Sequence, residues 1–421
     1  MNAKLKKKLF GRVLAYLRSC VIADGRVDWA GPSDEMTKLV EFEEQHLHQW
    51  VSRYGLVMDV TSEANQLVMD AEEQMPDGVL LDAVGNDALE KLAGETVDYF
   101  STLPHRHEYW IHLRGISELD LNKPLQIGEM LTLEKAEFAE GKGGLFKALI
   151  EGGGGALTPG QTPRAALQNG DTVLRVKVKG FSSGRISDSG PEAALSIAKE
   201  FFVLAETWGV LEHRGHIASD RLTGLMTQLP IKDYVWWIPG IQTHVLRHAD
   251  GYSLNGNLRT RTAGLLGPNP GEQMPVEGEE LREAVAARLR KFDSIFRETP
   301  DAHATSLRTA AQWFFDAQAE GNETSAFIYT SLGLEALLGD EKQPEGIGLM
   351  KLLGNRLAYL AGGTREAREK LIKRFEDFYG IRSRIVHGRA PRLSYEDRQM
   401  LFVGQTWLHA AIRKELYHAG T

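Results

Sequence analysis

The chain has 421 residues, of which 42% are hydrophobic and 25% charged, an ordinary composition for a globular protein of two or three domains. Its net charge of −8 argues against a general nucleic-acid coat, because affinity for the phosphate backbone grows with clustered lysine and arginine. The single cysteine, Cys20, excludes an intramolecular disulfide and a zinc site built from several cysteines. No apolar run approaches the length of a membrane span, and arginines interrupt the stretch after the basic start, so we expect a cytoplasmic protein without a secretory signal.

The first region, residues 1–96, is predicted to consist mainly of short helices and loops. Residues 41–51 form its amphipathic stretch. The cluster Glu43, Glu44, His46 and His48 invites a metal interpretation, but we interpret it as one side of a solvated helix.

The second region, residues 97–263, is predicted to be a β-rich domain with a helical insert. Strand-like alternation occurs at residues 108–113, 130–138, 145–151 and 172–180. A helix is expected at 191–212, and further strands at 234–247. Residues 264–278 are rich in glycine and proline and form the predicted linker.

The third region, residues 279–421, has helical periodicity throughout. After a charged helix at 279–297, helices are expected at 305–319, 324–338, 349–361, 365–387 and 396–417. Helices with such short connections form a bundle. The predicted fold class is therefore α+β, a mixed α/β N-terminal region followed by an all-α helical bundle.

This bundle contains an Arg-x4-His pattern closed by a glycine, at Arg382, His387 and Gly388. An arginine and a histidine about one and a half helical turns apart suit phosphodiester chemistry. Arg382 falls on the apolar face that the period sets with Phe375 and Phe378. A buried guanidinium costs several kcal/mol unless it is paired or serves a site, so Arg382 needs a partner.

Glu335 is the predicted partner of Arg382, since it lies i+4 from Ser331 between leucines and points at least partly inward. We interpret the pair as orienting the arginine rather than as taking part in catalysis. Its removal is expected to cost roughly 3–5 kcal/mol. Asn355 and Tyr379 could supply further hydrogen bonds.

The glycine of the pattern predicts where the long helix stops. Gly388 is suited to the left-handed position that follows a helix, which puts His387 at the helix C-terminus. The macrodipole there favours a protonated imidazole, whereas the neighbouring arginines oppose it. The sequence leaves the net effect open.

Three segments of the bundle resemble the HEPN superfamily, most closely its Apea-like branch. Residues 379–388 read Tyr-Gly-Ile-Arg-Ser-Arg-Ile-Val-His-Gly and are similar to the family's YxxRSxIVHG-type signature. Residues 329–339 are similar to its aLEaLl helix, and residues 353–360 to its RxAxL helix. The resemblance covers residues 305–417.

The resemblance implies a metal-independent endoribonuclease that acts on RNA as a homodimer, without a cofactor. It implies that Arg382 and His387 of both protomers meet at the dimer interface. It also implies an effector of a toxin–antitoxin or antiphage-defence system, with an antitoxin or another defence component as partner.

The residues themselves suit this chemistry. RNA carries its own nucleophile in the 2′-hydroxyl, so cleavage needs a general base, stabilisation of the phosphorane, and an acid for the leaving 5′-oxygen. His387 could serve as base or acid and Arg382 could stabilise the phosphorane, while Ser383 and Arg384 position phosphate. The second hypothesis is a non-catalytic bundle used for dimerisation or for sensing nucleotides or RNA, with Arg382 and His387 as interface hydrogen-bond donors.

A second histidine cluster lies in the β-rich domain, at His105, His107 and His112 with Glu108. Three imidazoles can hold zinc. The pair at i, i+2 lacks the spacing of known zinc signatures, and His112 would face away from it in an uninterrupted strand, so no metal site is predicted.

Charge is distributed unevenly along the chain. Residues 351–392 carry a net charge of +7, whereas residues 1–350 carry −15. A basic strip around the motif suits a local RNA cleft, although a charge run alone more often marks a solvated helix face.

Overall fold

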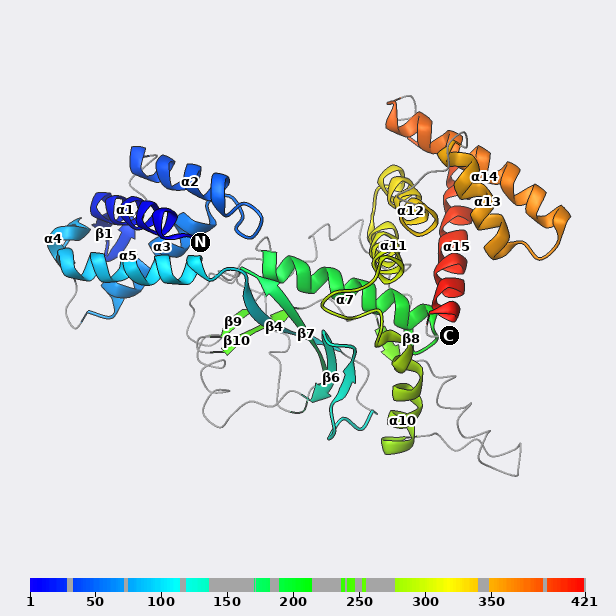
Figure 1. Ribbon diagram of the computed structural model, residues 1–421, viewed down its shortest axis with the longest axis horizontal. Coiled ribbons are helices and arrows are strands. Elements are labelled where there is room, and N and C mark those ends of the chain that lie inside the picture. Colours follow the sequence, from blue (N-terminus) through cyan, green and yellow to red (C-terminus); the bar gives the residue numbers. More distant parts are fainter. Residues whose placement is uncertain are drawn as a thin grey trace. The chain divides into compact units, whose positions relative to one another are not determined.

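The computed structural model describes residues 1–28, 33–71, 75–113, 119–135, 170, 172–181, 189–213, 236–238, 241–246, 252–254, 277–339, 348–388 and 392–419. The chain divides into two compact units. Figure 1 shows the helices and strands along the chain. Unit 1 comprises Met1–Glu108, Val178–Ala194 and Val235–His244. Unit 2 comprises Tyr109–Lys177, Leu195–Tyr234 and Val245–Thr421.

Unit 1 is built mainly from helices around one apolar core. Its helices are α1 (Ala3–Ser19), α2 (Asp34–His46), α3 (Gly55–Met69), α4 (Leu80–Val84) and α5 (Asn86–Ser101). Helix α1 buries an i, i+4, i+8 stripe, Leu9, Val13 and Leu17, and the Asn2 side chain caps its start. The N-terminal prediction of helices is confirmed.

A small antiparallel sheet in unit 1 is not among the predicted elements. Its order is β2-β1-β3, with β1 at Val21–Ala23, β2 at Arg26–Asp28 and β3 at Gly78–Val79. Strands of two or three residues are too short to show the alternation by which strands are recognised.

Glu43 corrects the interpretation of the first acidic and histidine cluster. Its side chain is buried, with the residue 1% exposed, rather than solvated. The carboxylate accepts hydrogen bonds of 2.7 Å from the backbone N–H groups of Tyr54 and Leu56. These groups open α3, whose N-cap Tyr54 supplies no side-chain cap, so a carboxylate of α2 satisfies donors that the helix start leaves free.

Unit 2 contains a run of antiparallel strands. Strands β5 (Leu125–Ile127), β6 (Leu131–Lys135) and β7 (Thr172–Gly180) pair in that order, with Leu133 opposite Leu125 and Leu174. The N–H of Leu113, which follows β4 (His105–His112), donates to the carbonyl of Thr172 at 2.9 Å. The strands predicted at 108–113 and 172–180 are confirmed.

Other predicted strands are confirmed in part. The strand predicted at 130–138 appears as β6, and its last three residues, like the strand predicted at 145–151, lie outside the described residues. The region predicted at 234–247 contains β9 (Trp236–Ile238) and β10 (Ile241–Leu246). Strands β8 (Leu211–His213) and β11 (Tyr252–Leu254) pair with each other.

Helix α7 (Ser189–Thr207) ends before the predicted position of 212. Gly209 adopts the left-handed conformation, with φ of 71°, and its N–H bonds back to Glu206 O. Glycine favours this conformation at helix ends, and the chain then enters β8.

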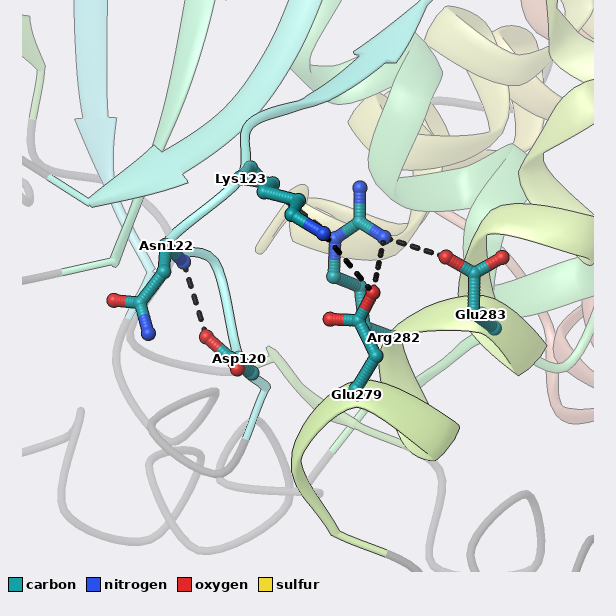
Figure 2. Close-up of polar contacts among 6 residues, drawn as sticks. All are labelled: Asp120, Asn122, Lys123, Glu279, Arg282 and Glu283. Carbon is teal, nitrogen blue, oxygen red and sulfur yellow. Dashed lines mark hydrogen bonds and ion pairs between the residues drawn. The ribbon is translucent and has the colours of Figure 1, made fainter.

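The predicted linker, 264–278, lies outside the described residues except for its last two positions, and helix α10 (Gly278–Leu289) begins there. Figure 2 shows the first turns of α10, where the Arg282 guanidinium points between Glu279 and Glu283, at 3.3 and 2.6 Å. Arg282 also donates to the carbonyl of Lys123, which ties this helix to the segment before β5. The 3-10 turn η1 (Arg290–Phe292) follows α10.

The rest of unit 2 is a helical bundle, and the α+β fold class is confirmed. Its helices are α11 (Ala302–Ala319), α12 (Glu323–Leu338), α13 (Leu349–Ala361), α14 (Arg365–Val386) and α15 (Tyr395–His418). Asp301, Asn322, Thr364 and Ser394 cap four of these helices through their side chains. The bundle helices follow the predicted ranges closely.

An aromatic stack lies at the centre of this bundle. The rings of Phe327 on α12 and Phe378 on α14 are stacked with centroids 4.5 Å apart, and both side chains are fully buried. Gly404 on α15 faces the Phe378 ring, so α14 and α15 approach closely at this point. In the part of the chain that the structure describes, no helix is both long and apolar enough to cross a membrane.

Candidate functional site around the end of helix α14

The candidate site begins at the C-terminus of α14. His387 is the C-cap residue, and its N–H donates to Ser383 O at 3.1 Å. Gly388 has a φ of 69°, and its N–H donates to Ile385 O at 2.9 Å. The imidazole of His387 is exposed. The helix end therefore lies where the glycine predicts it, and it presents the histidine to solvent.

Arg382 and Glu335 form the predicted ion pair. Arg382 Nε lies 3.2 Å from Glu335 Oε1, and the side chains are 26% and 20% exposed. Both atoms are shielded from water, but the angles between them do not satisfy a hydrogen bond. The contact is therefore an ion pair without a hydrogen bond between these two atoms.

The expectation that Arg382 occupies a core position is wrong. Ile381, one residue earlier, is 6% exposed and continues the buried stripe of Phe375 and Phe378. A helix turns about 100° per residue, so Arg382 lies at the edge of this stripe. Its guanidinium is thus positioned between the core and solvent.

Tyr379 completes the cluster around Arg382. The guanidinium carbon lies 5.5 Å from the centre of the Tyr379 ring, within the range of a cation–π contact. Burial raises the pKa of the Tyr379 hydroxyl, and the neighbouring Glu335 carboxylate adds to this effect while Arg382 opposes it. Asn355, the other expected contributor, is exposed on α13.

Arg384 has a partner that the pattern did not indicate. Its Nη2 donates to Asp397 Oδ1 at 2.9 Å. Asp397 also completes a capping box with Ser394 at the start of α15. Arg384 therefore links α14 to α15, and the Ser-x-x-Asp spacing is the sequence signal that could have suggested the acid. Ser383, the remaining predicted residue, is half-buried on α14.

The structure brings Arg382, Glu335 and Tyr379 together but does not bring His387 to Arg382. Among the described residues, no hydrogen bond or ion pair joins the Arg382 and His387 side chains. They are five positions apart in the sequence, which is roughly 140° around an ideal helix. Within one chain the arginine and the histidine are separate groups on one helix.

His105, in the β-rich region, has a packing role. The His105 ring stacks on Tyr99 with centroids 4.3 Å apart, and burial lowers the pKa of His105. No group of metal-binding side chains occurs among the residues that the structure describes. The side chain of His112 is outside that set.

Comparison of the chain with protein-family models, curated proteins and solved structures found no match. A function for the site is therefore supported by its own residues and by the motif in α14.

Proposed function

We propose that this protein is a metal-independent endoribonuclease of the HEPN type. The observation that carries the proposal is the position of Arg382. Its Nε lies 3.2 Å from Glu335 of α12, and Arg382 itself is on α14, the helix that ends at the exposed His387. An anchored guanidinium and a solvent-accessible imidazole are the groups that cleavage of RNA next to its 2′-hydroxyl requires.

In the proposed reaction the ribose 2′-oxygen attacks the adjacent phosphorus, and the P–O5′ bond breaks. His387 accepts the 2′-hydroxyl proton, and Arg382 stabilises the negative charge on the phosphorane oxygens. A protonated imidazole gives a proton to the departing 5′-oxygen. The products are a 2′,3′-cyclic phosphate and a 5′-hydroxyl. Ser383 and Arg384 position the phosphate.

A homodimer follows from the same chemistry. One chain provides a single motif histidine, whereas the reaction has two proton transfers, so His387 of the partner subunit supplies the second. The resemblance to toxin and antiphage-defence effectors suggests an antitoxin or another defence component as a further partner.

The test is incubation of the purified full chain with total RNA and tRNA in EDTA, beside His387→Ala. Wild type should produce 2′,3′-cyclic phosphate ends, and His387→Ala should lose at least about 100-fold in rate with an unchanged melting temperature. His48→Ala, which removes an exposed histidine after α2, is the matched control and should cut normally. Products with 5′-phosphate ends that disappear in EDTA would contradict the mechanism.

Sedimentation tests separately whether two chains contribute to one site. We expect a dimer at micromolar concentration, and an excess of His387→Ala chains mixed with wild type should lower the activity, because a mixed dimer keeps only one of the two histidines. A fully active monomer would rule out the contribution of a second chain.

The Arg382–Glu335 pair also supports the second candidate, a non-catalytic bundle for dimerisation or RNA sensing, because an ion pair can order an interface without chemistry. Under that function wild type would cleave nothing, and His387→Ala, which removes an interface hydrogen-bond donor, would weaken dimerisation.

A further inference from the structure

Tyr359 on α13 is a large aromatic side chain placed on the surface. The residue is 75% exposed, and an arginine contacts its ring. The guanidinium carbon of Arg368, near the start of α14, lies 4.9 Å from the centre of the Tyr359 ring. The Arg368 Nε donates to the carbonyl of Gly362 at 3.0 Å, which fixes the arginine in turn. The tyrosine and arginine form an ordered stack with much of the aromatic ring accessible.

The exposed side of α13 has the charge that suits an anionic partner. Lys351, Asn355 and Tyr359 are all exposed and follow each other at intervals of four residues, so they share one side of the helix. The sequence of α13, Leu349–Ala361, contains no acidic residue. At the start of α14, which packs against α13, the exposed acids Glu366 and Glu369 are already paired with Lys370 and Arg365.

We propose that this surface, formed by Lys351, Asn355, Tyr359 and Arg368, binds single-stranded RNA by stacking a base on Tyr359. This inference rests on the proposed function and adds to it a substrate-binding surface outside the residues of the cleavage motif. Aromatic rings and arginine planes are the usual platforms for unpaired bases, since every base presents a π-face. Lys351 lies two helical turns from Tyr359 and neutralises a backbone phosphate.

The stacking geometry also indicates which RNA structures and bases this surface binds preferentially. Stacking tolerates any base, whereas a regular duplex keeps its bases inside and offers no π-face. The surface therefore favours loops and unpaired ends over duplex, and purines over pyrimidines through their larger stacking area.

The experiment measures binding of fluorescent 2′-O-methyl oligoadenylate to the full-length chain by anisotropy. The 2′-O-methyl group removes the nucleophile, so affinity is read without cleavage. Tyr359→Ala should weaken binding about tenfold, and Tyr359→Phe should retain it. Tyr417→Ala is the matched control, because Tyr417 is also exposed, at 62%, and also has a cation, Lys291, over its ring. It should leave the affinity unchanged.

An abasic oligonucleotide of the same length separates stacking from charge. Tyr359→Ala should bind it as wild type does, whereas Lys351→Ala should weaken both probes. Unchanged affinity of Tyr359→Ala for oligoadenylate, or no binding by wild type, would overturn the inference, and the former would leave the surface as a candidate protein contact.

The cleavage assay distinguishes failure of the RNA-binding inference from failure of the proposed function. Tyr359-dependent binding by a chain that cleaves no RNA would leave the binding surface standing and remove the nuclease. If RNA cleavage requires His387 but RNA binding does not depend on Tyr359, the nuclease function is supported and the proposed binding surface is ruled out.

Discussion

At the scale of single residues, the position of Arg382 decides how strongly it depends on Glu335. Full burial of the arginine would make removal of its partner cost roughly 3–5 kcal/mol. The side chains are instead 26% and 20% exposed, so water reaches part of each charged group. The ion pair lies at the edge of the buried stripe of α14, and it orients the guanidinium more than it stabilises the fold.

We therefore expect Glu335→Ala to lower the free energy of unfolding by only about 1–2 kcal/mol, between the values for exposed and buried pairs. Urea unfolding followed by circular dichroism measures this change. Arg384→Ala is the comparison, since its pair with Asp397 involves an arginine that is 49% exposed, and its loss should stay below about 1 kcal/mol. A loss above about 3 kcal/mol for Glu335→Ala would restore the view that Arg382 is a buried charge.

At the scale of helices and strands, the sequence predicted the bundle well and the short strands poorly. Helices of 13 to 24 residues repeat their apolar stripe several times, and side chains such as Asn322 and Thr364 mark their starts. The strands of unit 1 contain two or three residues and leave no pattern.

The candidate site was predictable only in part. The helix end at His387 follows from local spacing, and the Arg382–Glu335 pair, which joins α14 to α12, follows from the need to neutralise a charge. The Arg384–Asp397 pair and the Arg368–Tyr359 stack depend on how neighbouring helices are aligned, which the spacing within one helix does not show.

Two glycines of the bundle test how closely its helices pack. A Cβ at Gly404 would overlap the Phe378 ring, with Cζ at 3.0 Å, whereas a Cβ at Gly380 on α14 meets nothing within 4 Å. Gly404→Ala should therefore destabilise the bundle by about 1–3 kcal/mol, through overpacking. Gly380→Ala should stabilise it by about 0.5–1 kcal/mol, because alanine has the higher helix propensity. Thermal melts that shift in the same direction for both variants would contradict the close contact between α14 and α15.

At the scale of the whole molecule, charge limits how RNA can bind. Residues 1–350 carry −15, so they repel a polyanion, and residues 351–392 carry +7. Part of this positive charge is already engaged in ion pairs on the bundle surface, as for Arg365 with Glu369 and Lys370 with Glu366. Lys373 and Arg374 are exposed on α14 and form no ion pair among the described residues.

The salt dependence of RNA binding therefore reports how many of these cations meet phosphate. Each phosphate neutralised on a single strand contributes about −0.7 to the slope of log affinity against log salt concentration. Contacts from three or four cations give a slope of about −2 to −3, whereas engagement of the whole surplus of positive charge would give about −5. Anisotropy titrations with 2′-O-methyl oligoadenylate over a range of salt concentrations measure this slope.

Arg374, an arginine of α14 that forms no ion pair among the described residues, provides the sharper comparison. Arg374→Ala should reduce the magnitude of the slope by about 0.7, because one phosphate contact is lost. Lys91→Ala, which removes an exposed lysine of α5 in the acidic part of the chain, should leave the slope unchanged. Equal effects of the two substitutions would mean that RNA binds by diffuse attraction to the whole surface, and the basic strip would then be a solvated helix face.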